Sequence, residues 1–357
     1  MYYEGSPEES PYNKFRTYKI KKGDTLASVA RDLGVEPNKL RWYHNMYCEI
    51  HDLIEADFKS HLQLLILAPE KCIEERKEKE EKKTQKVSLA SNYKLPFIAD
   101  KINKNYKVQY ITVDGDEVDT LEMEMSVKWL ATDKNRFHLF EINRSSIYVN
   151  NEMPNTVMDE LARKTAQVLY PLKIVVDESG KWIAVYNYNE IDSRWKHSKD
   201  KVLDYFEGQV AEKYIDETEY ALQNTDTLFS FLASDYFLRA FFNGIYIGYT
   251  ADFSFKNEVF FPLVKDEEAK FEVEQKINPL LDEFNLIKVE QKGHYVDDGS
   301  EANFGFDPWT GSYNASYFLD EHSYCIEKIN LECLVDYDEV IKVIIQIESF
   351  KKEETQI

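Results

Sequence analysis

The chain is 357 residues long, and its 65 Asp and Glu residues against 44 Lys and Arg residues give a formal net charge of -21. This length predicts two or three domains. A hydrophobic fraction of 43% with 14% aromatic residues indicates a globular protein rather than a disordered one. Because so acidic a chain repels phosphate backbones, the composition argues against nucleic acid as a partner.

The start of the chain, Met1–Ser10, has neither a basic beginning nor an apolar run, so we expect no secretory signal. No stretch is apolar for long enough to span a membrane. Cys325 and Cys333 could face each other across a hairpin, but nothing requires a bridge, and a reduced, cytoplasmic chain is the simplest expectation. The cysteines are scattered, without a Cys-x-x-Cys pair: Cys48, Cys72, Cys325 and Cys333.

Residues 1–16 are polar and predict a flexible arm, and the first regular pattern begins at Thr17. Tyr18 and Ile20 alternate with lysines, which predicts a short half-buried strand. Gly23 and Asp24 predict a turn, after which Asp24 or Thr25 can cap a helix. The apolar stripe of this helix has helical spacing: Leu26, Val29, Ala30 and Leu33.

A second helix is expected to open at Pro37, with Leu40, Tyr43 and either His44 or Tyr47 on one side. Residues 62–67 then predict a closing strand, which ends at Ala68-Pro69. The first domain, residues 17–70, therefore has the order strand, helix, helix, strand.

This order and its residues resemble a LysM domain. The resemblance implies a module that binds N-acetylglucosamine-containing glycans, such as peptidoglycan or chitin, in a shallow groove between two loops. The first half of the resemblance rests on Tyr18-x-Ile20-x-x-Gly23-Asp24-Thr25-Leu26-x-x-Val29-Ala30-x-x-Leu33-Gly34-Val35. The second half rests on Leu40-x-x-x-x-Asn45 and on Leu64-x-Ile66-x-x-Pro69.

By this resemblance, the first wall of the groove is formed by Gly23, Asp24, Thr25 and Leu26. The second wall differs from the usual LysM pattern. The connection formed by residues 46–61 is longer than the usual loop, and residues 57–61 stand where a Pro-Gly-Gln-like turn is usual. Asp57 and Phe58 are the candidate contacts there. Two ligands stay open: a peptidoglycan-type glycan, or a protein of a larger assembly.

Residues 71–86 form a charged run without an apolar stripe, which predicts a solvated linker. The remainder, residues 87–357, predicts an α+β domain with an antiparallel sheet and matches no family pattern that we recognise. Three helices are expected in it. The first begins at Pro154, the second spans residues 191–220, and the third follows a cap at residues 225–227. Its expected strands are residues 107–113, 121–130, 136–142, 146–150, 172–176, 182–186, 245–250, 257–263, 271–277, 285–291, 313–319, 324–333 and 340–349, with residues 333–339 as the last turn.

Residues 303–313 interleave glycine with aromatic residues, and they are the most unusual segment of the larger domain. If exposed, this loop would be a contact surface for a protein or a sugar. If packed down, it would be a lid over the core. The candidate contact residues are Phe304, Phe306, Trp309 and Tyr313.

Nothing in the sequence indicates catalysis, a cofactor or a metal site. The histidines form no His-x-x-x-His or His-Glu-x-x-His pattern, and the acidic segments 114–119 and 297–301 lack the spacing of a calcium loop. We therefore expect a non-enzymatic binding or adaptor protein without nucleic-acid binding or membrane insertion. A hydrolase within residues 87–357 stays open as a further alternative, because the resemblance to LysM modules implies that fusions to hydrolases are common. The alternative to glycan recognition is a structural part of a contractile injection, type VI-like secretion or phage-tail-like assembly, because LysM-like modules also occur there.

Overall fold

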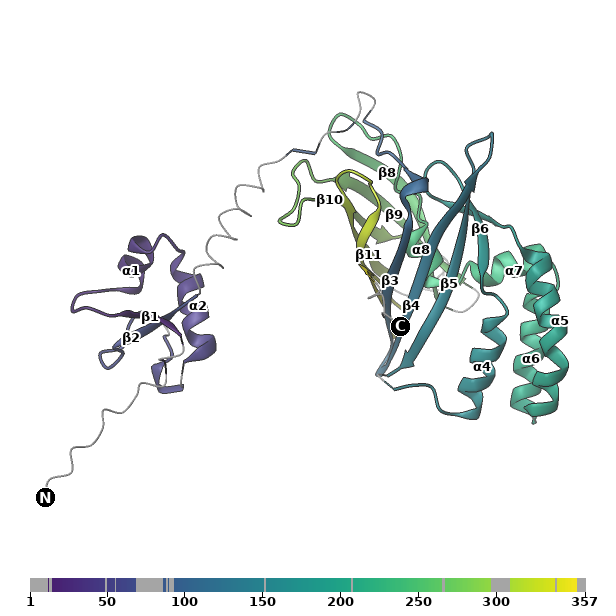
Figure 1. Cartoon of the computed structure of the whole chain (residues 1–357), viewed down its shortest axis with the longest axis horizontal. Helices are drawn as coiled ribbons and strands as arrows, with labels where there is room; N and C mark the ends of the chain where they lie inside the picture. The colour runs from purple at the N-terminus through teal and green to yellow at the C-terminus, as the bar shows by residue number, and fades with distance from the viewer. Residues whose placement is uncertain are drawn as a thin grey trace, which may run out of the picture. The chain divides into compact units, whose positions relative to one another are not determined.

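The computed structural model describes residues 12, 15–48, 50–54, 56–68, 86–87, 89, 93–150, 152–206, 208–264, 267–296, 309–337 and 339–351. Internal contacts divide the chain into two compact units, Met1–Lys82 and Lys83–Ile357. Figure 1 shows helices together with a large sheet, in agreement with the α+β class. Except for Lys86, the segment expected as a linker lies outside the described residues.

Within its described residues, the small unit has two strands, two helices and a short 3-10 turn. Its elements are β1 (Arg16–Lys19), α1 (Leu26–Asp32), α2 (Pro37–Tyr47), the turn Ile50–Asp52 and β2 (Leu64–Leu67). The two strands pair antiparallel. β2 begins at Leu64 rather than at Leu62, because the N–H of Leu62 closes a turn on the carbonyl of Lys59. The core consists of Leu26, Val29, Ala30, Leu40, Ile54, Leu62, Leu65 and Leu67.

The end of the expected flexible arm is packed against this unit. Tyr12 is buried, and its hydroxyl donates to Oδ2 of Asp52 at 2.5 Å. Arg16 already belongs to β1. The prediction of a loose arm up to residue 16 is therefore wrong at its C-terminal end, where Tyr12 is held by Asp52 and Arg16 pairs within the sheet.

His44 is the buried polar residue at the centre of the small unit. Its Nδ1 accepts the backbone N–H of Ile66 at 3.1 Å, and its Nε2 lies 3.1 Å from the carbonyl oxygen of Asp52. The ring thus joins α2 to β2 and to the 3-10 turn. Of the two residues that the sequence offered for this face of α2, His44 is buried and Tyr47 is exposed.

The described part of the large unit contains one 11-stranded antiparallel sheet in the order β7-β6-β5-β4-β3-β13-β12-β11-β10-β9-β8. β13 lies between β12 and β3, so the last strand joins two meanders that are distant in sequence. The strands are β3 (Asn103–Asp114), β4 (Glu117–Thr132), β5 (His138–Val149), β6 (Leu172–Val176), β7 (Trp182–Val185), β8 (Ser254–Val264), β9 (Glu267–Ile277), β10 (Leu286–Tyr295), β11 (Thr310–Asp320), β12 (Ile326–Asp336) and β13 (Val340–Phe350).

The helices of this unit connect strands; α7 and α8 contact the sheet at β7 and β12, while α4 packs against α5 and α6 (Figure 1). α4 joins β5 to β6, and four helices join β7 to β8. Buried side chains alternate along the strands with polar ones, as in β13, where Val343, Ile345 and Ile347 point inward. The helices are α4 (Val157–Gln167), α5 (Tyr188–Tyr205), α6 (Gln209–Ala221), α7 (Thr225–Leu232) and α8 (Tyr236–Phe241).

Several elements of the large unit differ from the sequence prediction. The run expected as one helix over residues 191–220 is two helices, because the chain turns at Phe206 and at Gly208, which has a φ of 106°. Residues 245–250 form no strand; Tyr246 and Tyr249 are buried there, and the backbone makes one isolated bridge, between Gly248 and Lys94. α7 is capped by Asn224, one residue before the expected cap. Oδ1 of Asn224 accepts hydrogen bonds from the N–H groups of Asp226 and Thr227.

Candidate functional site

The first loop of the small unit, between β1 and α1, is held by its own polar side chains. Gly23 has a φ of +98°, a conformation that favours glycine. Oδ2 of Asp24 accepts the Tyr18 hydroxyl at 2.9 Å and the Lys21 N–H at 2.8 Å. The backbone hydrogen bond from Lys21 is the main cause that lowers the pKa of Asp24. Asp24 therefore fixes the turn.

Thr25 and Leu26 begin α1 and serve its folding. Thr25 is the N-cap, and its side chain and that of Ser28 form a reciprocal capping box. Leu26 is only 5% exposed and belongs to the core. The prediction that Leu26 contributes a surface wall is therefore wrong, because its side chain points into the unit.

The second loop is tied to the first by Asp57. Its Oδ1 accepts the backbone N–H of Leu26 at 2.6 Å and that of Phe58 at 2.8 Å. A carboxylate at a helix N-terminus satisfies an N–H that the helix itself leaves open. Phe58 is half-buried and packs against the core. The structure thus brings the two candidate loops together, while the side chains of Asp24, Thr25 and Asp57 are engaged in internal hydrogen bonds.

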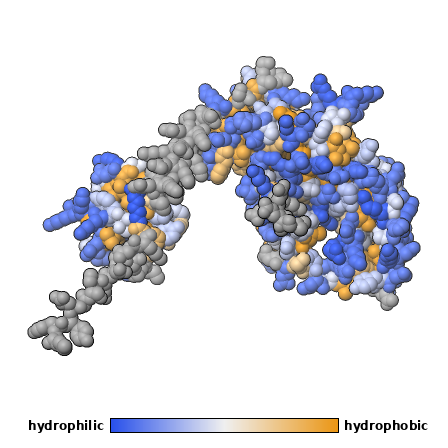
Figure 2. Space-filling view, viewed as in Figure 1, coloured by the Kyte–Doolittle hydropathy of each residue, from blue (hydrophilic) through white to orange (hydrophobic). Residues whose placement is uncertain are grey.

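A second surface of the small unit lies on α2, and we call it the α2 face: Trp42, Tyr43, Met46 and Tyr47. Trp42 is 57% exposed, Met46 48% and Tyr47 43%. The ring of Tyr47 lies 4.9 Å from that of Tyr43 and 5.4 Å from that of Phe15. The signal in the sequence was the pair of apolar residues at positions 42 and 46, one helical turn apart and outside the core stripe. Figure 2 shows apolar surface on both units among polar side chains.

The aromatic loop of the large unit is only partly within the described residues, since Phe304 and Phe306 lie outside them. Trp309 is half-buried, and its ring meets that of Tyr337 edge-on at 4.7 Å. Tyr313 is buried within β11 and packs against Phe261 and Phe271. Tyr313 is therefore a core residue, and its prediction as a contact residue is wrong.

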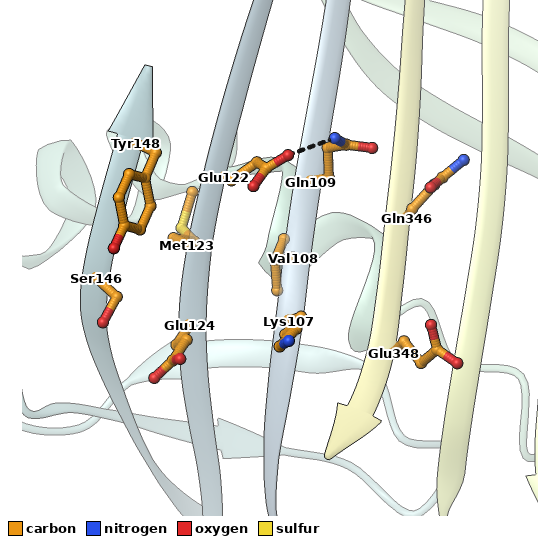
Figure 3. Close-up of a pocket in the computed structure, with 10 residues that line it drawn as sticks. All are labelled: Lys107, Val108, Gln109, Glu122, Met123, Glu124, Ser146, Tyr148, Gln346 and Glu348. Carbon is orange, nitrogen blue, oxygen red and sulfur yellow. Dashed lines mark hydrogen bonds between the residues drawn. The ribbon is translucent and has the colours of Figure 1, made fainter. Parts of the chain in front are cut away.

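A shallow groove of about 360 Å³ lies on the face of the sheet formed by β3, β4, β5 and β13 (Figure 3). Nε2 of Gln109 donates to Oε1 of Glu122 at 2.6 Å across the two strands. Lys107 stands opposite Glu124 on one side and Glu348 on the other. Lys107 offsets only part of the negative charge of these glutamates, and charged neighbours across strands are typical of a solvent-facing sheet surface.

The described cysteines, Cys48, Cys325 and Cys333, are free thiols. Cys325 precedes β12 and Cys333 lies in its middle, so they cannot face each other across a hairpin, and residues 333–336 continue the strand instead of turning. His322 lies in the turn before Cys325 rather than on a strand. Within the described residues, no group of three or more His, Cys, Asp or Glu side chains is placed to hold a metal ion. Residues 114–117 are the turn between β3 and β4, and residues 297–301 lie outside the described part.

No family model matches the chain. No curated protein is significantly similar to it. Among the helices of the described ranges, none combines the length and the apolar character needed to cross a membrane.

Proposed function

We propose that the protein is a non-enzymatic binding or adaptor protein whose small unit carries the recognition surface. The observation that carries this proposal is the α2 face. Trp42, Met46 and Tyr47 leave about half of their apolar side chains in water, although the unit has a separate core for Leu40 and His44 of the same helix. Exposed aromatic and methionine side chains on one helix are typical of a docking surface.

A partner protein is the occupant that this surface supports best. An apolar helix face docks into a groove or against another helix through residues one turn apart, as positions 42 and 46 are. The resemblance to LysM modules implies assemblies in which such a module can dock protein: contractile injection, type VI-like secretion and phage-tail-like machines. We propose that the protein is a cytoplasmic part of such an assembly. Genes for a sheath, tube or spike beside its own gene would support this role, and their absence would count against it.

Recognition of a peptidoglycan-type glycan is the second candidate, and the pairing of the two loops supports it. The Leu26–Asp57 hydrogen bond holds Gly23–Thr25 beside Phe58, so a shallow ligand could lie across both loops. Co-sedimentation with purified peptidoglycan tests this candidate. Thr25→Trp would block the loops and abolish binding, whereas Trp42→Ala on the α2 face would leave it unchanged. Equal sedimentation of wild type and Thr25→Trp would exclude the loop groove.

A further inference from the structure

The large unit contains a cavity of about 1040 Å³ between its helices and the sheet. Its walls come from the end of α4, from α6 and α7, and from the α7–α8 connection, and Arg144 of β5 also lines it. α6 packs against both α4 and α7 on the same side of the sheet (Figure 1). This helical cavity is separate from the small unit and from the sheet groove, and it is large enough for several side chains of a ligand.

The deep part of the helical cavity holds polar groups whose hydrogen-bonding capacity is incompletely used. The guanidinium of Arg144 lies over the ring of Tyr170 at 4.9 Å. Asp235 uses Oδ1 to cap α8 through the N–H of Leu238 at 2.8 Å, and burial raises the pKa of its carboxyl group. Arg144 and Asp235 still balance each other electrostatically at this depth.

Tyr110 adds a buried hydroxyl to the same region. Its side chain is 7% exposed, and its electrostatic neighbours are Asp235, Tyr170 and Arg144. The hydroxyl lies near the backbone N–H of Phe237 but makes no hydrogen bond of normal geometry within the described chain. A buried polar atom without a partner costs about 1–3 kcal/mol. Such a group beside a cavity is therefore expected where a ligand or a bound water completes it.

The outer part of the helical cavity is acidic and aromatic. Asp216 of α6 and Asp226 of α7 are exposed there. Glu217 lies beside them and pairs with Lys213 at 3.9 Å. Tyr220 is 70% exposed and Phe231 54% exposed at the same rim. Carboxylates next to the faces of aromatic rings favour ammonium and guanidinium groups through ion pairing and cation–π contact.

We propose that the helical cavity is a docking site for a basic segment of a partner protein, whose Lys or Arg side chains lie between the aromatic rim and the carboxylates of Asp216 and Asp226. Charge complementarity selects this occupant, since Arg144 is the one basic residue among the described residues that line the cavity. The net charge of -21 on the whole chain would also attract a basic partner over a distance. This site does not depend on the role of the small unit.

Fluorescence anisotropy of the full-length protein with a short labelled peptide, in which Lys alternates with Leu, tests this docking site. The double variant Asp216→Asn/Asp226→Asn should weaken binding at least about tenfold. The matched control Asp200→Asn/Asp204→Asn removes the same charge from exposed positions on α5 that do not line the cavity. It should bind the peptide nearly as wild type does.

Two further arms separate the cavity from general attraction to an acidic protein. Ser230→Trp fills the outer cavity from an exposed position on α7 without a change of charge, and it should also abolish binding. Spermidine in excess should displace the peptide poorly, because it lacks the apolar side chains. Equal affinities of the two double variants would overturn the proposal. Full displacement of the peptide by spermidine, added at the same total concentration of positive charge, would also overturn it. So would wild-type peptide affinity of Ser230→Trp, provided that this variant has a native circular dichroism spectrum.

Discussion

His44 is held in the small unit as a neutral imidazole. Its Nδ1 accepts the N–H of Ile66, so this nitrogen carries no proton. Burial is the main cause that lowers the pKa of His44, and the nearby Asp52 offsets part of that effect. Protonation would therefore break a buried hydrogen bond and place a charge beside the core.

We predict that the small unit becomes less stable in mild acid. A histidine with a lowered pKa contributes stability above its unfolded pKa of about 6.5, and this stability is lost as the pH falls below that value, with a limiting slope of about 1.4 kcal/mol per pH unit. Hydrogen exchange of the β2 peptide in the full-length protein, corrected for intrinsic exchange rates, measures this effect. His61→Gln should keep the pH dependence and His44→Gln should flatten it. The same pH dependence in both variants would contradict this assignment.

Asp57 tests the connection between the two loops of the small unit. Asp57→Ala removes the acceptor for the N–H groups of Leu26 and Phe58. Loss of a cap of this kind lowers the stability by about 0.5–2 kcal/mol. Asp57→Asn should retain most of this stabilisation, because an amide oxygen can accept the same hydrogen bonds. Faster hydrogen exchange at α1 in Asp57→Ala than in Asp57→Asn is expected. Equal exchange in both would show that the loops are held by other contacts.

At the scale of single elements, Arg194 of α5 closes the end of α4. Its guanidinium donates from Nε to the carbonyl of Val168 at 2.7 Å and from a terminal nitrogen to those of Leu169 and Pro171. These carbonyls belong to the C-cap of α4 and to the segment that follows it, and a planar guanidinium can bind several of them together. One side chain thus fixes α4 against α5.

We expect Arg194→Gln to destabilise the large unit by about 1–3 kcal/mol, because hydrogen bonds to a charged group are lost and carbonyls are left open. Urea unfolding followed by near-ultraviolet circular dichroism measures this change. Arg163→Gln, an exposed arginine on α4, is the matched control and should unfold at the wild-type urea concentration. Coincident curves for the two variants would contradict the proposed closure of α4.

Helix caps and strands could be predicted from the sequence, because their signals lie within a few neighbouring residues. Thr25 was one of two expected caps of α1, and the strand expected over residues 340–349 is confirmed by β13. The helical period also continues from α5 into α6, so the break at Phe206 and Gly208 could not be seen from apolar spacing. The contact role expected of Tyr313 was wrong because a tyrosine on a strand looks the same whether its ring faces the core or water.

At the scale of the whole molecule, the order of the sheet depends on contacts between distant segments. β13 pairs with β3, more than half the chain away, and no spacing in the sequence indicates that pairing. The helical cavity was unpredictable for the same reason, since Arg144, Asp216 and Asp235 meet only after the sheet and helices pack. The sequence could give the α+β class but not this strand order.

The central position of β13 gives a prediction for two neighbouring residues. Ile345 is fully buried, whereas Gln346 faces solvent. Ile345→Asp places an unpaired charge in the core and should prevent native packing of the large unit. Gln346→Asp makes the same side chain on the opposite face and should retain the native near-ultraviolet spectrum. Native spectra for both variants would contradict the position of β13.

The proposal of a binding or adaptor protein is tested most directly by photo-crosslinking from the α2 face inside the cells that make the protein. A photoreactive phenylalanine analogue in place of Met46 should give a discrete adduct with another protein, and Trp42→Ala in the same chain should remove that adduct. The analogue in place of Arg31, which is exposed on α1, should give no such adduct. Absence of any adduct at position 46, or the same adducts from positions 31 and 46, would contradict the account.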